Sequence, residues 1–349
     1  MVRFTETMKN RTILVTGGTG YIGSHTVVEL QKQGYKVVII DNLSNSKKNV
    51  VNSIKKITGV KPGFKNFDLC DFKKTQNFFK KNKNISAIIH FAAFKAVGES
   101  VEKPLDYYNN NLISLINILK CASEFRVNNF VFSSSCTVYG QPDKLPVSEG
   151  FPFSPANSPY GSTKQMCEEI LRFSSDKINI NTISLRYFNP VGAHESSLIG
   201  ELPNGTPNNL VPFITQTAIG KRKCLNVFGQ NYNTPDGTCI RDYIHVVDLA
   251  KAHIKAVDYL YKDKNKSGYK VFNIGTGTGY SVLDIIKTFE EISEKKLNYK
   301  IVDKRKGDIE KIWANTKTAN KELDWRAEKS LKEMLSSSWE WEKKINKKS

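Results

Sequence analysis

The chain has 349 residues, 39% of them hydrophobic and 25% charged, and it carries a formal net charge of +18. These proportions are typical of a soluble globular enzyme. No apolar stretch is long enough to cross a bilayer, and residues 1–10 contain no apolar signal region. We therefore expect a cytoplasmic protein with no membrane partner.

The excess of positive charge is spread along the chain. The lysines occur in short pairs, such as Lys47-Lys48 and Lys80-Lys81, rather than in one arginine-rich helix or between aromatic residues. This pattern is typical of charged solvent faces, so we expect no nucleic-acid partner. The charge nevertheless favours long-range attraction of anionic substrates.

The cysteines and histidines do not indicate a metal centre. The six cysteines are widely separated and form no C-x-x-C pair, which favours free thiols in a reducing compartment. The five histidines lack the spacing of metal ligands, so we predict no metal site.

Short β-branched runs alternate with helical segments through the first half of the chain. We predict a helix over residues 22–33 and strands over residues 13–16, 37–40, 64–67, 87–90, 130–133 and 182–185. This alternation indicates an α/β fold with a Rossmann-type doubly wound parallel sheet.

Glycine, proline and asparagine interrupt the pattern beyond residue 189, and a helix is predicted over residues 331–343. We therefore predict a Rossmann domain over residues 1–189 and a smaller C-terminal domain, interpreted as substrate-binding, over residues 190–349. The chain is free to cross between the two more than once.

A glycine-rich loop lies between the first predicted strand and helix. Its spacing, Gly17-x-x-Gly20-x-x-Gly23, allows a tight turn and brings backbone amides close to a pyrophosphate at the helix N-terminus. Asp41 ends the next strand, where a carboxylate accepts hydrogen bonds from the adenosine ribose and repels a 2′-phosphate. The sequence therefore predicts NAD rather than NADP. Asp68 has two interpretations, a hydrogen bond to the adenine amine or a cap of the following helix.

A candidate reaction centre lies further along the chain. Tyr160 and Lys164 are four residues apart, so a helix places them on one face. A free tyrosine is a poor base, but an ammonium and a positive nicotinamide ring favour its phenolate. Lowering the tyrosine pKa by about three units corresponds to about 4 kcal/mol. The segment 133–140 follows a strand end, where α/β folds bind ligands. Cys136 in this segment has no evident histidine partner, so we expect it to pack rather than to react.

Together, Gly17–Gly23, Ser133–Gly140 and Tyr160–Lys164 resemble the extended short-chain dehydrogenase/reductases, and in particular the UDP-glucose 4-epimerase family. Further segments share the likeness, which extends from about residue 11 to residue 343; they are residues 41–46, 90–100, 185–194, 207–210 and 237–246.

The resemblance implies reversible epimerisation of UDP-glucose and UDP-galactose at C4. In that reaction a tightly bound NAD takes up the C4 hydride, a 4-keto sugar turns over in the pocket, and the hydride returns to the opposite face. The resemblance also implies a homodimer formed through the helices around residues 100–122 and 157–174.

The same resemblance assigns residues to roles. It makes Tyr160 the catalytic base, Lys164 its electrostatic partner and Ser135 a hydroxyl that shares the proton. The NAD-binding residues that it implies are Gly17, Gly20, Tyr21, Ile22, Gly23, Asp41, Asn42, Asn45, Ser46, Asp68, Leu69, Phe91, Ala92, Ala93, Lys95, Asn110, Ser133, Tyr160, Lys164 and Tyr187. The substrate-binding residues that it implies are Lys95, Ser135, Tyr160, Asn189, Asn209, Leu210, Arg241, Arg305 and Asp308.

Two positions depart from the family or vary within it. Ala93 stands where the family usually has glycine, and Ile312 stands where side-chain size influences acceptance of N-acetylated sugars. Epimerisation of another UDP-sugar therefore stays open, whether UDP-GlcNAc/GalNAc, a uronic acid or a pentose.

Other functions are disfavoured by particular residues. A 4,6-dehydratase needs an acid and a base beside the central hydroxyl, whereas residues 135–138 contain no carboxylate. This counts against elimination chemistry, and a related nucleotide-sugar decarboxylase is the other close alternative. A non-catalytic NAD-binding regulator is disfavoured because both Tyr160 and Lys164 are present.

Overall fold

The computed structural model describes residues 11–262, 268–305 and 308–347. Within these segments seven parallel strands form one sheet, in the order β10-β6-β5-β4-β1-β2-β3. Its strands are β1 (Thr12–Thr16), β2 (Lys36–Ile40), β3 (Gly63–Lys65), β4 (Ile85–His90), β5 (Asn129–Ser133), β6 (Asn181–Tyr187) and β10 (Tyr269–Ile274). This is the strand order of a doubly wound dinucleotide-binding sheet with one strand added, and it confirms the predicted fold class.

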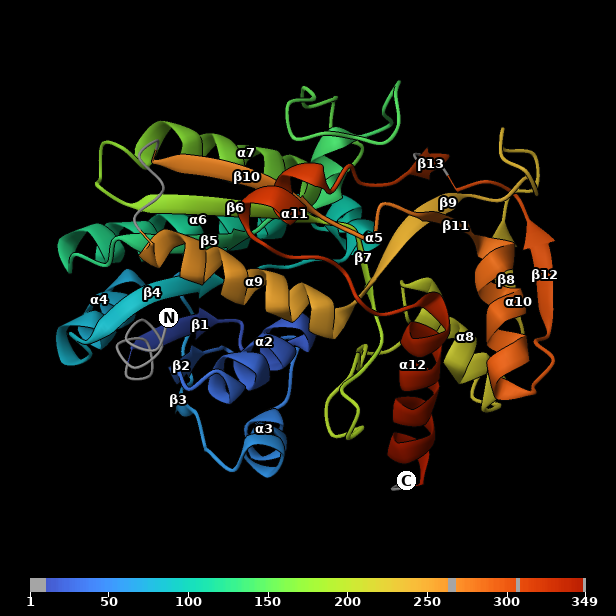
Figure 1. Ribbon diagram of the computed structural model, residues 1–349, viewed down its shortest axis with the longest axis horizontal. Helices are drawn as coiled ribbons and strands as arrows, with labels where there is room; N and C mark the ends of the chain where they lie inside the picture. The colour runs from blue at the N-terminus through green and yellow to red at the C-terminus, as the bar shows by residue number, and fades with distance from the viewer. Residues whose placement is uncertain (1–10, 263–267, 306–307, 348–349) are drawn as a thin grey trace.

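Helices cover both faces of the sheet (Figure 1). One face carries α2 (Tyr21–Lys32), α3 (Val50–Thr58) and α9 (Val246–Tyr261). The other carries α4 (Phe72–Lys81), α6 (Pro104–Glu124) and α7 (Pro159–Ser174). The short helix α5 (Val97–Glu102) precedes α6, and the 3-10 turn η1 (Cys136–Tyr139) follows β5.

Alternation along the strands explains the two cores. In β1, Ile13 and Val15 pack into the cluster beneath α2 and α9, whereas Leu14 packs into the cluster beneath α4, α6 and α7. Because successive side chains point to opposite faces and both faces are buried, the strand is apolar throughout rather than alternating. The third strand is shorter than predicted. It ends at Lys65, two residues before the predicted end at residue 67.

The C-terminal part builds a second lobe beside the carboxyl edge of the large sheet (Figure 1). In it β9 pairs with β7, β11 and β13, and β8 pairs with β12. Its strands are β7 (Asn189–Val191), β8 (Leu225–Phe228), β9 (Ile240–His245), β11 (Gly279–Ser281), β12 (Tyr299–Val302) and β13 (Lys311–Ile312). The remaining helices are α8 (Leu210–Ala218), α10 (Val282–Ser293), α11 (Lys317–Glu322) and α12 (Leu331–Asn346).

The chain returns to the large sheet after entering the second lobe. Following β9, helix α9 packs against α2, and β10 then pairs with β6 along the sheet edge. A division at residue 189 therefore assigns one strand of the large sheet, β10, and two helices that pack on it, α9 and α11, to the C-terminal segment. None of the helices in the part of the chain that the structure describes is long and apolar enough to cross a membrane.

Candidate active site

The predicted site residues follow the carboxyl ends of the parallel strands. Gly17 follows β1, Asp41 follows β2 and Phe91 follows β4. Ser133 ends β5, and Tyr187 ends β6. Parallel strands all end at one edge, and the strand order reverses between β1 and β4, which is where such sheets bind ligands.

The glycine loop leaves no room for side chains. Gly17 has a φ of +68°, and a Cβ placed on it would lie 2.8 Å from the Ala92 backbone nitrogen. A Cβ on Gly23 would overlap the Gly17 carbonyl oxygen. Gly20, the N-cap of α2, has no side chain to occupy the first amides of the helix. The cradle therefore suits a pyrophosphate, whose negative charge the helix N-terminus favours.

Asp41 joins the glycine loop to the loop after β2, on the side where the adenosine is expected. Its buried carboxylate accepts hydrogen bonds from the backbone nitrogens of Thr19 (3.1 Å) and Leu43 (2.8 Å) and from the Ser46 hydroxyl (3.2 Å). The carboxylate is thus held at the end of β2 in the position where a ribose hydroxyl is expected.

Asp68 lies beside the loop after β2 and does not cap a helix. Asn42 Nδ2 donates to its carboxylate at 3.1 Å. The cap of α4 is Asp71, which accepts from the Lys74 backbone nitrogen at 3.0 Å. The capping interpretation of Asp68 is therefore wrong, and the adenine interpretation stays a prediction.

The loop after β4 is held by a residue that the sequence analysis missed. Asn111 Oδ1 accepts from the backbone nitrogen of Phe94 at 2.8 Å, and its Nδ2 donates to Thr163 Oγ1 at 3.0 Å. The predicted cofactor residue Asn110 donates to the same Oδ1 at 2.9 Å. Asn111 thereby joins this loop to α7, and its place in the run Asn109–Asn111 was the available signal.

The structure brings the candidate base and its lysine together on α7. Ser158 caps this helix, so Tyr160 falls in its first turn and Lys164 one turn later. Both side chains are buried, and Lys164 Nζ lies 5.8 Å from the centroid of the Tyr160 ring. Lys164 Nζ also donates to the Ser133 carbonyl at 2.7 Å, and the Ser133 and Tyr187 hydroxyls are 2.7 Å apart.

Burial dominates the ionisation of these groups. It raises the pKa of Tyr160, although a hydrogen bond with Ser135 acts in the opposite direction. Burial lowers the pKa of Lys164 to about 8, against the raising effects of Cys167 and Glu168. Tyr160 therefore needs a further positive group near it to ionise at neutral pH. Burial raises the pKa of the Cys136 thiol to about 12, which agrees with packing rather than reaction.

The predicted substrate residues lie in the second lobe and in the loops facing it. Arg241 on β9 forms an ion pair with Asp308 at 2.8 Å. The Arg305 guanidinium stacks on the Phe228 ring, 4.1 Å from its centroid. Asn189 begins β7. Arg241 and Asp308 are thus brought together although 67 positions separate them in the chain.

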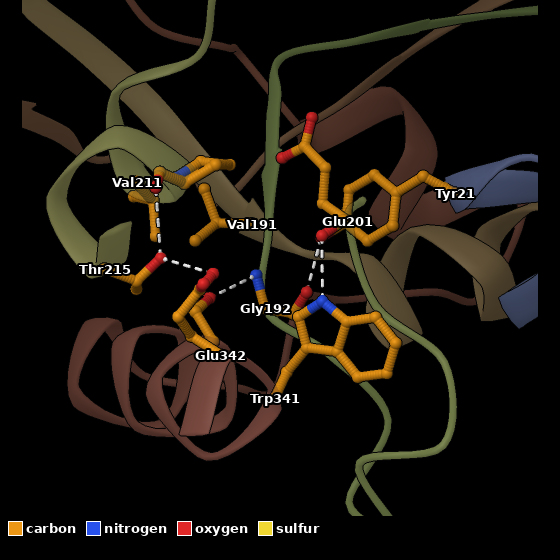
Figure 2. A pocket seen from close by; sticks show the side chains of 10 residues that line it. Tyr21, Val191, Gly192, Glu201, Val211, Thr215, Trp341 and Glu342 are labelled. Atoms are coloured by element: carbon orange, nitrogen blue, oxygen red, sulfur yellow. Dashed lines mark hydrogen bonds between the residues drawn. The ribbon is translucent and has the colours of Figure 1, made fainter. Parts of the chain in front are cut away.

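Asn209 and Lys95 meet at a residue that the sequence analysis also missed. Glu201 Oε1 accepts from Asn209 Nδ2 at 2.6 Å and from Lys95 Nζ at 3.5 Å. The Glu201 carbonyl accepts from Trp341 Nε1 at 2.8 Å, and Figure 2 shows its carboxylate directed away from that indole. Glu201 and Trp341 line a pocket together with Tyr21, whose hydroxyl donates to the Gly192 carbonyl at 2.6 Å. No local pattern around Glu201 marks it, because its partners come from distant segments.

Neither a metal cluster nor a disulfide is built here. Across residues 11–262, 268–305 and 308–347, no group of three or more His, Cys, Asp or Glu side chains could hold a metal ion. All six cysteines, each within those ranges, are free, as the sequence predicts.

Comparison with known proteins identifies the family. Residues 14–338 match the GDP-mannose 4,6 dehydratase family. The chain is 50% identical over 331 residues to the UDP-glucose 4-epimerase of Bacillus subtilis, covering 95% of this chain and 96% of that protein. A UDP-glucose 4-epimerase crystal structure from Stenotrophomonas maltophila, with NAD and formylated UDP-arabinopyranose, superposes with a TM-score of 0.93. It is 43% identical, over 97% of this chain and 100% of that one.

A second solved structure agrees. The UDP-glucose 4-epimerase of Bifidobacterium longum, in complex with NAD+ and UDP, is 45% identical with a TM-score of 0.91, over 96% of this chain and 99% of that one. Identities of this size over nearly the whole length, together with the site geometry, place the chain in the UDP-glucose 4-epimerase family of the extended short-chain dehydrogenase/reductases.

Proposed function

We propose that the chain interconverts UDP-glucose and UDP-galactose by oxidising the sugar at C4 to a ketone and reducing it from the other face. The observation that carries this proposal is the buried pair Tyr160 and Lys164, placed at the carboxyl edge of a sheet whose glycine loop suits a dinucleotide. Membership in the epimerase family supports the substrate pair.

The resident cofactor is NAD. The residues around the glycine loop fit it, because the Gly17–Gly23 cradle excludes side chains and Asp41 holds a carboxylate where a ribose hydroxyl is expected. When bound, NAD supplies the hydride acceptor and donor for the sugar carbon. We expect it to remain bound through turnover.

The reaction needs proton transfer at one hydroxyl. Tyr160 Oη removes the proton from the sugar 4-hydroxyl and returns it after the sugar has turned over. Lys164 stabilises the phenolate through its charge, and Ser135 shares the proton through its hydrogen bond to Tyr160. Arg241 and Asn209 anchor the UDP moiety, so its binding energy keeps the keto sugar in the pocket.

Elimination chemistry is not supported by this site, although the matching family carries a dehydratase name. The residues that follow Ser135 are Cys136 and Thr137, and neither supplies an acid or a base of the strength that dehydration needs. The buried Cys136 thiol, with its pKa raised to about 12, stays protonated. Epimerisation needs only the proton shuttle between Tyr160 and the sugar hydroxyl.

The direct test is to mix purified protein with UDP-galactose and follow UDP-glucose formation, with and without added NAD. We expect product in both arms, because the cofactor co-purifies. A parallel arm with UDP-GalNAc tests whether Ile312, which is buried in one cluster with Cys136 and Val138, leaves room for an acetamido group. Absence of UDP-glucose at saturating substrate and NAD would contradict the proposed function.

We infer that the protein acts as a homodimer. Large apolar side chains are exposed on three adjacent helices, with Leu105 on α6 79% exposed and Phe173 on α7 67% exposed. Val97 and Val101 on α5 are exposed as well, and we call these four side chains the apolar patch. Exposed large apolar side chains on adjoining helices are typical of an interface, and a two-fold dimer covers them by pairing the same helices of both copies.

Replacing Leu105 with glutamate should therefore convert a dimer into a monomer, because it places a charge at the most exposed of these apolar side chains. Size-exclusion chromatography with light scattering measures the mass of each variant. Val60→Glu is the matched control, since Val60 is 57% exposed but lies after α3, away from the patch. A wild-type protein of one chain mass would contradict the dimer.

We place the enzyme in the cytoplasm. Its six cysteines are all free within the described residues, and free thiols persist in a reducing compartment.

A further inference from the structure

A buried ion pair contacts the turn Ser133–Ser135, here called the serine turn, and is not part of the proposed reaction chemistry. Arg186 on β6 and Glu168 on α7 are 2.6 Å apart, and their side chains are only 6% and 2% exposed. Arg186 Nε also donates to both carboxylate oxygens, at 3.0 and 3.1 Å. The pair is thus forked, which fixes the orientation of the carboxylate.

Glu168 connects this pair to the reaction centre from two sides. It lies one helical turn after Lys164, on the same face of α7. Its Oε1 accepts a short hydrogen bond from the Ser134 hydroxyl, between Ser133 and Ser135. Lys164 Nζ donates to the Ser133 carbonyl, so both side chains of α7 hold the same turn.

Arg186 anchors the carboxylate to the rest of the fold. Its Nη1 donates to the Tyr139 hydroxyl at 3.0 Å and to the Glu149 carbonyl at 3.1 Å. Tyr139 in turn donates to Asn273 Oδ1 on β10 at 2.7 Å. The guanidinium therefore ties α7 to η1 and to the edge of the large sheet.

Such a pair is an unusual choice for stability alone. Removing two charges from water costs free energy, and replacing a buried ion pair with apolar residues is often neutral or stabilising. The site of this pair, against the serine turn and one turn from Lys164, points to a role in the reaction.

We propose that Glu168 is a positioning residue of the epimerase reaction, with a carboxylate that fixes the Ser133–Ser135 turn and keeps Lys164 protonated beside Tyr160. Arg186 holds that carboxylate in place. This inference rests on the proposed function, because it assigns Glu168 a role in activating the same base.

The charges around Lys164 support this role. His90 on β4 has a pKa lowered to about 3 by burial and by Lys164, so it is neutral at physiological pH. Burial raises the pKa of the Cys167 thiol to about 12, so it is neutral too. The Ser133 carbonyl contributes a dipole and Tyr160 a phenol. Among these groups, Glu168 is the one that is negatively charged, and it raises the pKa of Lys164 although the neighbouring Arg186 offsets part of its charge.

The test is Glu168→Gln, which keeps the shape and removes the charge. The control is Glu169→Gln, which breaks an exposed pair with Arg172 on the same helix. We expect Glu168→Gln to lower kcat by about 10-fold or more above pH 8, because each unit lost from the Lys164 pKa reduces its charged fraction about tenfold there. Its KM for UDP-galactose should stay within about 3-fold, and the alkaline limb of the pH–rate profile should move to lower pH.

A second readout does not depend on turnover. With NAD bound, ultraviolet phenolate absorbance, taken as the difference from the Tyr160→Phe protein, gives the pH at which Tyr160 ionises. This pH should rise in Glu168→Gln, because Lys164 loses its proton earlier. If the wild type fails to epimerise, the proposed function fails, yet this titration still tests the role of Glu168.

Ser134→Ala keeps the ion pair and removes only the hydrogen bond to the turn, so it serves if Glu168→Gln does not fold. We expect it to lower kcat by about 10-fold with KM unchanged. The proposal is overturned if folded Glu168→Gln matches Glu169→Gln in kcat, pH profile and phenolate titration. If only Ser134→Ala folds, a kcat equal to that of wild type overturns it.

Discussion

Replacing Tyr160 with phenylalanine should lower kcat by about 10²- to 10⁴-fold, while the protein keeps its NAD. The change removes the oxygen that takes the proton from the sugar 4-hydroxyl. It leaves the ring in its buried place in the first turn of α7. The measurement is kcat for UDP-galactose at saturating substrate, with NAD quantified after acid release from the folded protein.

The buried position of the Tyr160 hydroxyl also disfavours its ionised form. Burial raises the pKa of Tyr160, so its phenolate forms only when positive groups are close to it. Tyr299→Phe is the matched control, because Tyr299 lies 41% exposed on β12 in the second lobe and its loss should leave kcat unchanged. A Tyr160→Phe protein with the wild-type rate would show that another group is the base.

The sheet was predictable where its strands are short, buried and β-branched. The strands β1, β2, β4, β5 and β6 coincide with the predicted runs to within two residues, because burial on both faces demands continuous apolar residues there. β10 was not predicted. Its partner β6 lies more than 80 positions earlier in the chain, and nothing in residues 269–274 indicates which strand they join.

The chemistry of the site was predictable from local motifs, but its support was not. Gly17–Gly23 and Tyr160–Lys164 are readable because their function requires a fixed spacing within one loop or one helix. Glu168 and Arg186 belong to different elements and meet only in the folded chain. Glu201 likewise gathers Lys95 and Asn209 from separate segments, so no local spacing marks it.

Replacing Lys164 with methionine should lower kcat by about 10²-fold or more at pH 7, because the change removes the ammonium that stabilises the Tyr160 phenolate. Part of the loss should be recovered at higher pH, where Tyr160 ionises without that help. Lys295→Met, at an exposed lysine after α10, should behave as wild type. Lys164 also donates to the carbonyl of Ser133, which is a predicted NAD-binding residue. The assay should therefore contain excess NAD.

The same substitution should raise the free energy of unfolding at pH 7, since an ammonium is costly to bury and methionine is not. Burial lowers the pKa of Lys164 from 10.5 to about 8, so the unfolded chain binds one more proton than the folded one between these values. The folded wild type is therefore penalised below pH 8, and the penalty fades as pH rises towards 10.5. Denaturant unfolding at pH 7 and pH 10 should show the variant's advantage shrinking. An advantage that grows with pH, or a kcat at pH 7 within about 3-fold of wild type, would contradict the assigned charge and role of Lys164.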